Sequence, residues 1–227
     1  FFNAFDSYPE IWVDDGTGKL VYGSTLPGTK DALATLHQMY VDGLLDPEFA
    51  VKDDGKVAEA TTSGKCGIMF GAQWNSIYPL QNSKNLEPEG QWQAFPIVTA
   101  TDHKAKAQTD VGTTAWTVVR KDCEHPEAVV KMYNLFIDKC WGPNNENGVY
   151  YAPLDSESIW KLSPVTPTKP DKNLKAFLDL EAARQSGDFS QVTGEGYSIL
   201  QKLQAFESGS EEGFALWGWE RIYGAEG

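Results

Sequence analysis

The chain has 227 residues, enough for one large domain or two small ones, and a formal net charge of −13. This acidic balance argues against nucleic acid and against an anionic membrane surface as partners, because both are bound by clustered basic side chains. No apolar run approaches the roughly 20 residues that span a bilayer, and the longest uncharged apolar stretch covers residues 66–70. We expect both ends, Phe1 and Gly227, to lie within a longer protein.

The beginning of the chain carries the pattern of a hairpin followed by two helices. Residues 10–22 predict a β-hairpin, because two short apolar runs flank the turn sequence Asp-Asp-Gly-Thr-Gly. Apolar side chains at helical spacing predict a helix over about residues 30–42, with Thr29 as its N-cap and Gly43 at its end. A second helix is predicted over residues 56–63, ended by Gly64. The apolar face of the first helix comprises Leu33, Leu36, Tyr40 and Leu44.

Three apolar segments have the length and composition of strands. They cover residues 66–70, 92–98 and 115–119. Between the first two, residues 73–80 predict a short helix that ends near Pro79. Because strands alternate with helices along the chain, the pattern predicts a protein of the α/β class.

The second half of the chain is predicted to be mainly helical. A helix is expected over residues 122–138, with Pro126 in its first turn. Residues 142–153 are rich in Gly, Asn and Pro and predict a loop, and the three prolines of residues 164–170 predict an extended connector. Three helices follow: one with Leu174, Phe177, Leu178 and Ala182 on a shared face, and two over about residues 195–208 and 211–222.

The three cysteines leave the redox compartment open. Cys66, Cys123 and Cys140 are odd in number, and their spacings fit no zinc site. A single disulfide between Cys123 and Cys140 and three free thiols are both compatible with the sequence. We expect no metal and no cofactor.

Eight tryptophans give the chain an unusual supply of large flat side chains. Trp74 follows a Gly-containing turn and opens a helical segment, Trp116 lies within a predicted strand, and Trp217 begins the sequence Trp-Gly-Trp. An indole offers a rigid apolar face with a polar N–H at one edge, and a neutral sugar offers an apolar C–H face with a rim of hydroxyls. The positions of these tryptophans, more than their number, therefore favour carbohydrate binding.

Several motifs in order resemble one known family. The sequence Ser-Gly-Lys-Cys-Gly-Ile-Met-Phe-Gly-Ala-Gln-Trp covers residues 63–74, and Leu-Leu-Asp-Pro-Glu-Phe covers residues 44–49. An Ala-Trp-Thr-Val-Val-Arg-Lys segment at residues 115–121 is followed by His-Pro-Glu-Ala at 125–128, and Trp-Gly-Trp-Glu-Arg-Ile-Tyr-Gly closes the pattern at 217–224. Together they resemble the extracellular solute-binding proteins, family 1, of carbohydrate ABC importers, and in particular the large sugar-binding lipoproteins of Gram-positive bacteria.

The resemblance implies an α/β, periplasmic-binding-protein-like (type II) fold, of which this chain represents mainly the C-terminal part, with the N-terminal lobe mostly absent. On that basis, residues 1–98 are expected to form a second-lobe segment. Residues 99–150 would be a crossover segment and residues 151–227 a C-terminal helical segment.

The resemblance further implies that the protein binds an extracellular carbohydrate, in oligosaccharide form, and delivers it to the permease subunits of an ABC transporter. Trp74, Asn75, Trp116 and Trp217 are the expected ligand-binding residues. The protein is expected to be a monomer at the cell surface, held by a lipid anchor outside this chain, and to have no catalytic residues.

Two other classes remain open. A glycoside hydrolase needs two carboxylates flanking a cleft, and no acidic residue here lies in a motif that marks such a pair. A surface adhesion module without a small ligand is compatible with the acidic, aromatic-rich composition. A change in tryptophan fluorescence with oligosaccharides would favour the binding protein, and release of reducing ends would favour the hydrolase.

Overall fold

The computed structural model describes residues 1–109, 112–113 and 115–225, and it divides the chain into two compact units. Unit 1 comprises Phe1–Ala72 and Leu86–Val111, and unit 2 comprises Gln73–Asn85 and Gly112–Gly227. The predicted segments with boundaries near residues 98 and 150 refer to the lobes of a whole solute-binding protein. They stay a prediction, because the two units reflect contacts within this chain alone.

The predicted hairpin is confirmed in unit 1. Strand β1 (Trp12–Asp14) pairs antiparallel with β2 (Leu20–Tyr22), with Val13 opposite Val21 at the centre. The Asp14 carboxylate accepts hydrogen bonds from the backbone N–H groups of Gly16 and Gly18, at 2.7 and 3.0 Å. Both glycines have positive φ, a conformation that other residues rarely adopt. The turn chemistry of the loop therefore fixes the hairpin locally.

The helices of unit 1 lie close to their predicted positions. Helix α1 (Pro27–Val41) begins earlier than expected, because Pro27 occupies its first turn. Thr29 is not the N-cap; its hydroxyl forms a 2.6 Å hydrogen bond with that of Ser7. The predicted stops are confirmed: Gly43 and Gly64, just beyond α1 and α2 (Asp54–Thr62), both have positive φ. The described part of the unit also contains short 3₁₀ helices, η1 (Phe2–Phe5), η2 (Gly23–Thr25) and η3 (Phe49–Val51).

The predicted apolar face of α1 is not the buried one. Leu33 and Tyr40 are exposed, whereas Ala32 is fully buried. The contact with η1 explains the difference, because a Cβ at Gly28 would lie only 1.7 Å from the carbonyl oxygen of Phe5. Small side chains permit this close approach, so α1 packs through them rather than through its leucines.

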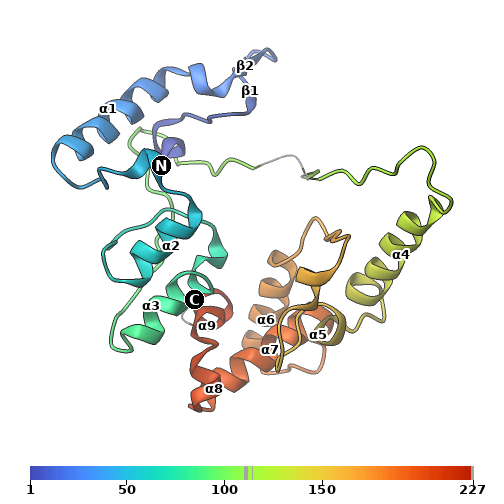
Figure 1. Ribbon diagram of the computed structural model, residues 1–227. Helices are drawn as coiled ribbons and strands as arrows, with labels where there is room; N and C mark the ends of the chain where they lie inside the picture. The colour runs from blue at the N-terminus through green and yellow to red at the C-terminus, as the bar shows by residue number, and fades with distance from the viewer. Residues whose placement is uncertain (110–111, 114, 226–227) are drawn as a thin grey trace. The chain divides into compact units, whose positions relative to one another are not determined.

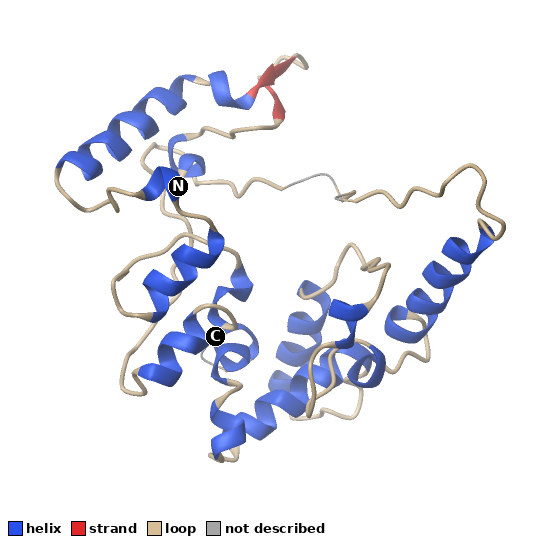
Figure 2. Ribbon diagram, viewed as in Figure 1, coloured by secondary structure: helices blue, strands red, loops and turns tan. Residues whose placement is uncertain are grey.

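The three further predicted strands are absent from the described residues, where β1 and β2 form a two-stranded sheet (Figure 2). Residues 66–70, 92–98 and 115–119 have no ladder partner there, and Ile68 and Val118 are largely exposed. A strand exists only through hydrogen bonds to a neighbour, which a segment's own sequence cannot supply. The described chain is therefore mainly helical with one small sheet, compatible with part of an α/β protein.

Unit 2 is built from helices (Figure 1). Pro79 precedes a helix instead of ending one, since the predicted helix 73–80 is replaced by a 3₁₀ turn and a following α-helix. The predicted helix 211–222 is likewise two shorter helices, and a short helix interrupts the predicted loop 142–153. The elements are η4 (Gln73–Ser76), α3 (Leu80–Leu86), α4 (Glu127–Trp141), α5 (Asn147–Tyr150), η5 (Ile159–Leu162), α6 (Leu174–Ser186), α7 (Gly194–Glu207), α8 (Glu211–Phe214) and α9 (Trp217–Tyr223).

Two apolar clusters form the core of unit 2. The first joins α6, α7 and α9, and the second joins the end of α4 to the segment after α5. The first contains Ala176, Leu180, Ala183, Val192, Ile199, Leu200, Leu203 and Tyr223, and the second contains Phe136, Cys140, Trp141, Tyr151, Ala152 and Val165. These clusters hold the helices that support the candidate site described next.

The cysteines form no disulfide: all three are free, with Cys140 buried and Cys123 exposed. Of the two alternatives that the sequence left open, the structure therefore shows free thiols.

Candidate functional site

Trp74 lies on a short helical turn and presents its indole to solvent. It is the second residue of η4, and the side chain is 51% exposed. Its carbonyl oxygen accepts hydrogen bonds from the N–H groups of Ile77 at 2.9 Å and Tyr78 at 3.3 Å. These bonds occupy the carbonyl group of Trp74, while about half of its side chain remains exposed to solvent.

Asn75, the next residue of η4, has a buried side-chain oxygen with no hydrogen-bond partner. A buried polar atom without a partner costs about 1–3 kcal/mol. Because this oxygen is buried, a ligand can bond to it only after the Asn75 side chain rotates toward the surface. The turn therefore combines an exposed apolar face with a hydrogen-bonding group that is not yet satisfied.

Trp116 lies in an extended segment of unit 2 and is 78% exposed. The following residue, Thr117, ties this segment to α4 through a 2.9 Å hydrogen bond between its hydroxyl and that of Tyr133. Trp116 is thus a second exposed indole, as expected of a ligand platform. Within the described residues no ring contact joins it to Trp74.

Trp217 is placed differently from the other two tryptophans. It begins α9, is only 5% exposed, and has the ammonium group of Lys84 lying 5.8 Å from its ring centroid. Other residues of unit 2 cover both faces of its indole, so in this structure the ring is not accessible to a ligand. The sequence pattern could not show this, because the burial depends on residues more than a hundred positions away.

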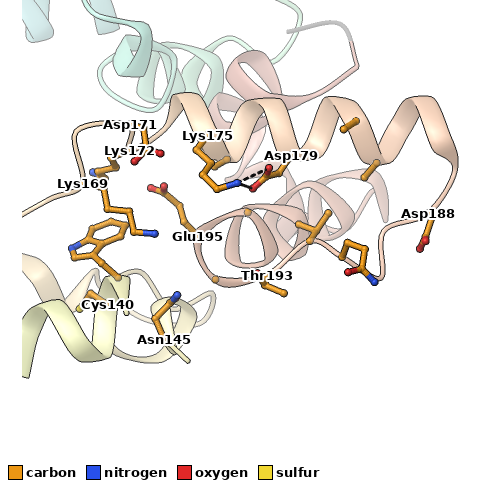
Figure 3. Close-up of a pocket in the computed structure, with 18 of the residues that line it drawn as sticks. Cys140, Asn145, Lys169, Asp171, Lys172, Lys175, Asp179, Asp188, Thr193 and Glu195 are labelled. Atoms are coloured by element: carbon orange, nitrogen blue, oxygen red, sulfur yellow. Dashed lines mark hydrogen bonds and ion pairs between the residues drawn. The ribbon is translucent and has the colours of Figure 1, made fainter. Parts of the chain in front are cut away.

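Sequence reasoning did not find a hollow of about 490 Å³ in unit 2, between the end of α4, α6 and the beginning of α7 (Figure 3). Glu195 extends into it, with Lys172 nearby (Figure 3). Burial raises the pKa of Glu195, and the N–H of Asn173, 3.3 Å from the carboxylate, partly opposes that rise. The signal in the sequence was the three lysines between residues 169 and 175 of an acidic chain.

The hollow is lined by basic and acidic side chains and also by buried apolar ones. On α6, Lys175 forms an ion pair with Asp179 at 2.8 Å. The buried residues Ala176 and Ala183 of the same helix also line the hollow. Such a lining can accommodate a polar solute. Among the residues that the structure describes, no group of three or more His, Cys, Asp or Glu side chains is arranged to hold a metal ion.

The same described part of the chain has no helix that is both long enough and apolar enough to cross a membrane. The chain belongs to the bacterial extracellular solute-binding proteins, whose family model matches residues 1–139. Membership implies a periplasmic-binding-protein-like fold.

The matched region contains Trp74, Asn75 and Trp116, whereas Trp217 and the whole lining of the hollow lie beyond it. A relative from Niallia circulans, described as an uncharacterized protein in the butB 5′ region, is 27% identical over 133 residues. The alignment covers 54% of this chain and 52% of the relative, so the chain spans about half the length of the curated relative it matches. No solved structure matches the chain.

Proposed function

We propose that this chain is part of a receptor that binds an extracellular carbohydrate, in the form of an oligosaccharide, and delivers it to the permease of an ABC importer. The observation that carries the proposal is the half-exposed indole of Trp74 beside the unsatisfied amide of Asn75. Membership in the solute-binding family supports the general class. The carbohydrate is inferred from the chemistry of the turn.

A neutral sugar fits this chemistry because it is amphipathic in the same way as the turn. Its C–H face stacks on an indole, and its hydroxyls both donate and accept hydrogen bonds. The Trp74 ring would cover the apolar face while the Asn75 amide bonds a hydroxyl at the rim. Trp116 would stack on a second sugar ring of the same oligosaccharide.

The binding step is expected to involve closure of two lobes about a hinge. A ligand favours the closed state only to the extent that it binds that state more tightly. The exposed apolar side chains of residues 66–70 and 115–119 support the presence of strand partners elsewhere in the whole protein. We therefore propose that other segments complete the site around Trp74 and Trp116.

The first experiment is a fluorescence titration of the whole protein with neutral disaccharides and trisaccharides of different linkage. A sugar stacked on Trp74 changes the tryptophan emission, and the Trp74→Phe variant loses most of that change. An equal response in the variant would remove Trp74 from the site. Release of reducing ends during the same titration would instead support a glycoside hydrolase, and no response to any sugar would favour an adhesion module.

The remaining parts of the proposal concern the whole protein. We propose that it acts as a monomer at the cell surface, attached by a lipid anchor outside this chain, and that it is not an enzyme. Gel filtration of the whole protein tests the monomer, and release from cells by a lipase tests the anchor. The assay for reducing ends described above tests for enzymatic activity.

A further inference from the structure

The turn that carries Trp74 packs unusually closely on helix α9. A Cβ atom at Gly218 would lie 2.4 Å from the carbonyl oxygen of Ser76 and 2.6 Å from the Cα of Ile77. Real Cβ atoms do not approach backbone atoms so closely, so the contact requires glycine. The contact joins two segments more than 140 residues apart in sequence, both within unit 2.

Side chains on the Trp74 side hydrogen-bond both backbone groups of Gly218. The Ser76 hydroxyl donates to the Gly218 carbonyl at 2.8 Å, and the Gly218 N–H donates to Oε1 of Gln81 at 2.8 Å. The amide nitrogen of Gln81, a buried residue, donates to the carbonyl of Phe214 at 3.1 Å and to Oδ1 of Asn85 at 2.8 Å. One buried glutamine therefore bridges α3 to the segment that leads into α9.

Trp217 immediately precedes Gly218, the glycine of this contact. Its ring is buried while that of Trp74 is half exposed, although the two residues belong to elements in direct contact. The two tryptophans thus have different placements: Trp217 is enclosed within the unit, and Trp74 is half exposed on the turn.

We propose that Trp217, Gly218 and Gln81 are positioning residues that form a seat for the turn bearing Trp74. The seat fixes the backbone of η4, so the indole is held ready for the ligand rather than ordered at the moment of binding. Pre-organisation of this kind raises affinity by lowering the ordering cost. The inference rests on the proposed role of Trp74 in sugar binding, and it assigns Trp217 a supporting task in place of ligand contact.

The test uses the whole protein labelled with 5-fluorotryptophan, in which the ¹⁹F line of Trp74 is assigned with Trp74→Phe. Ser76→Ala removes one hydrogen bond of the seat, and Gly218→Ala forces the two backbones apart. Both variants are expected to shift or broaden the Trp74 line and to leave the Trp116 line unchanged. Ser76→Thr keeps the hydroxyl and is expected to restore the original line.

Gly28→Ala is the matched control. Gly28 is enclosed as tightly as Gly218, but its contact is with Phe5 in unit 1. It is expected to leave the Trp74 line unchanged. An unaltered Trp74 line in Ser76→Ala would overturn the proposal, and this variant decides the matter even where Gly218→Ala does not fold.

Sugar binding is then measured separately, with maltose and cellobiose as probes. If either sugar binds, Ser76→Ala is expected to weaken that binding about fivefold, as loss of one hydrogen bond at the seat implies. Binding that persists together with an unaltered ¹⁹F line contradicts the seat and leaves the proposed function in place. A shifted line without binding of any sugar contradicts the proposed function and leaves the seat in place.

Discussion

Helix α6 offers a sharp test of which side of a helix is buried. Sequence spacing places Leu178 on the apolar face, whereas in the structure Leu178 is 54% exposed and Leu180, two residues later, is 0% exposed. Leu180 packs in the cluster that joins α6, α7 and α9. Truncation of a fully buried leucine to alanine costs about 2–5 kcal/mol, because apolar contacts are lost and a cavity remains.

We therefore expect Leu180→Ala to lower the free energy of unfolding by about 3 kcal/mol. Leu178→Ala is the matched control on the same helix and is expected to change it by less than about 0.5 kcal/mol. Urea denaturation gives both values, and peptide-level hydrogen exchange of α6 and α7 shows whether the loss arises at this cluster. Equal losses in the two variants, or a larger loss in Leu178→Ala, would refute the packing described for α6.

Two further predictions concern buried groups of unit 2. The ammonium of Lys202 donates to the carbonyl of Ala152 at 2.9 Å, and burial lowers its pKa from 10.5 to about 8. Between these two pH values Lys202 is protonated in the unfolded chain and largely neutral in the folded chain, so the unfolded state binds more protons than the folded state. The free energy of unfolding should therefore rise with pH from about 8 toward 10.5. Denaturation midpoints should show this rise, and a slope that is identical in Lys202→Met would contradict it. Ellman's reagent should modify exposed Cys123 rapidly and Cys140 only after unfolding, since Cys140 is buried and burial raises its thiol pKa; equal rates would contradict this.

Local chemistry made part of the fold predictable. The hairpin follows from the turn residues between Trp12 and Tyr22, and the ends of two helices follow from Gly43 and Gly64. Each of these features depends on residues within a few positions of one another. The proline at position 79 was harder to interpret, because a proline suits the residue just before a helix as well as the residue after one.

Features that depend on distant partners were not predictable from one sequence. Apolar composition gave residues 66–70 the appearance of a strand, but strand pairing needs a neighbour that the described chain does not supply. The candidate site shows the same limit. Trp74, Trp116 and Trp217 were all expected to bind the ligand, and that role stays a prediction. Trp74 and Trp116 are exposed, whereas Trp217 is buried, with Lys84 lying 5.8 Å from its ring centroid.

Isothermal titration of the whole protein with the sugar that gives the strongest fluorescence response tests the central claim most directly. Trp74→Ala is expected to lose about 1–3 kcal/mol of binding free energy, the contribution of a large aromatic contact. Trp12→Ala is the matched control, because Trp12 is 65% exposed in the hairpin of unit 1 and is not one of the residues of the proposed site. It is expected to leave the affinity unchanged. Equal affinity in the wild-type protein and Trp74→Ala would contradict the assignment of Trp74 as the sugar platform.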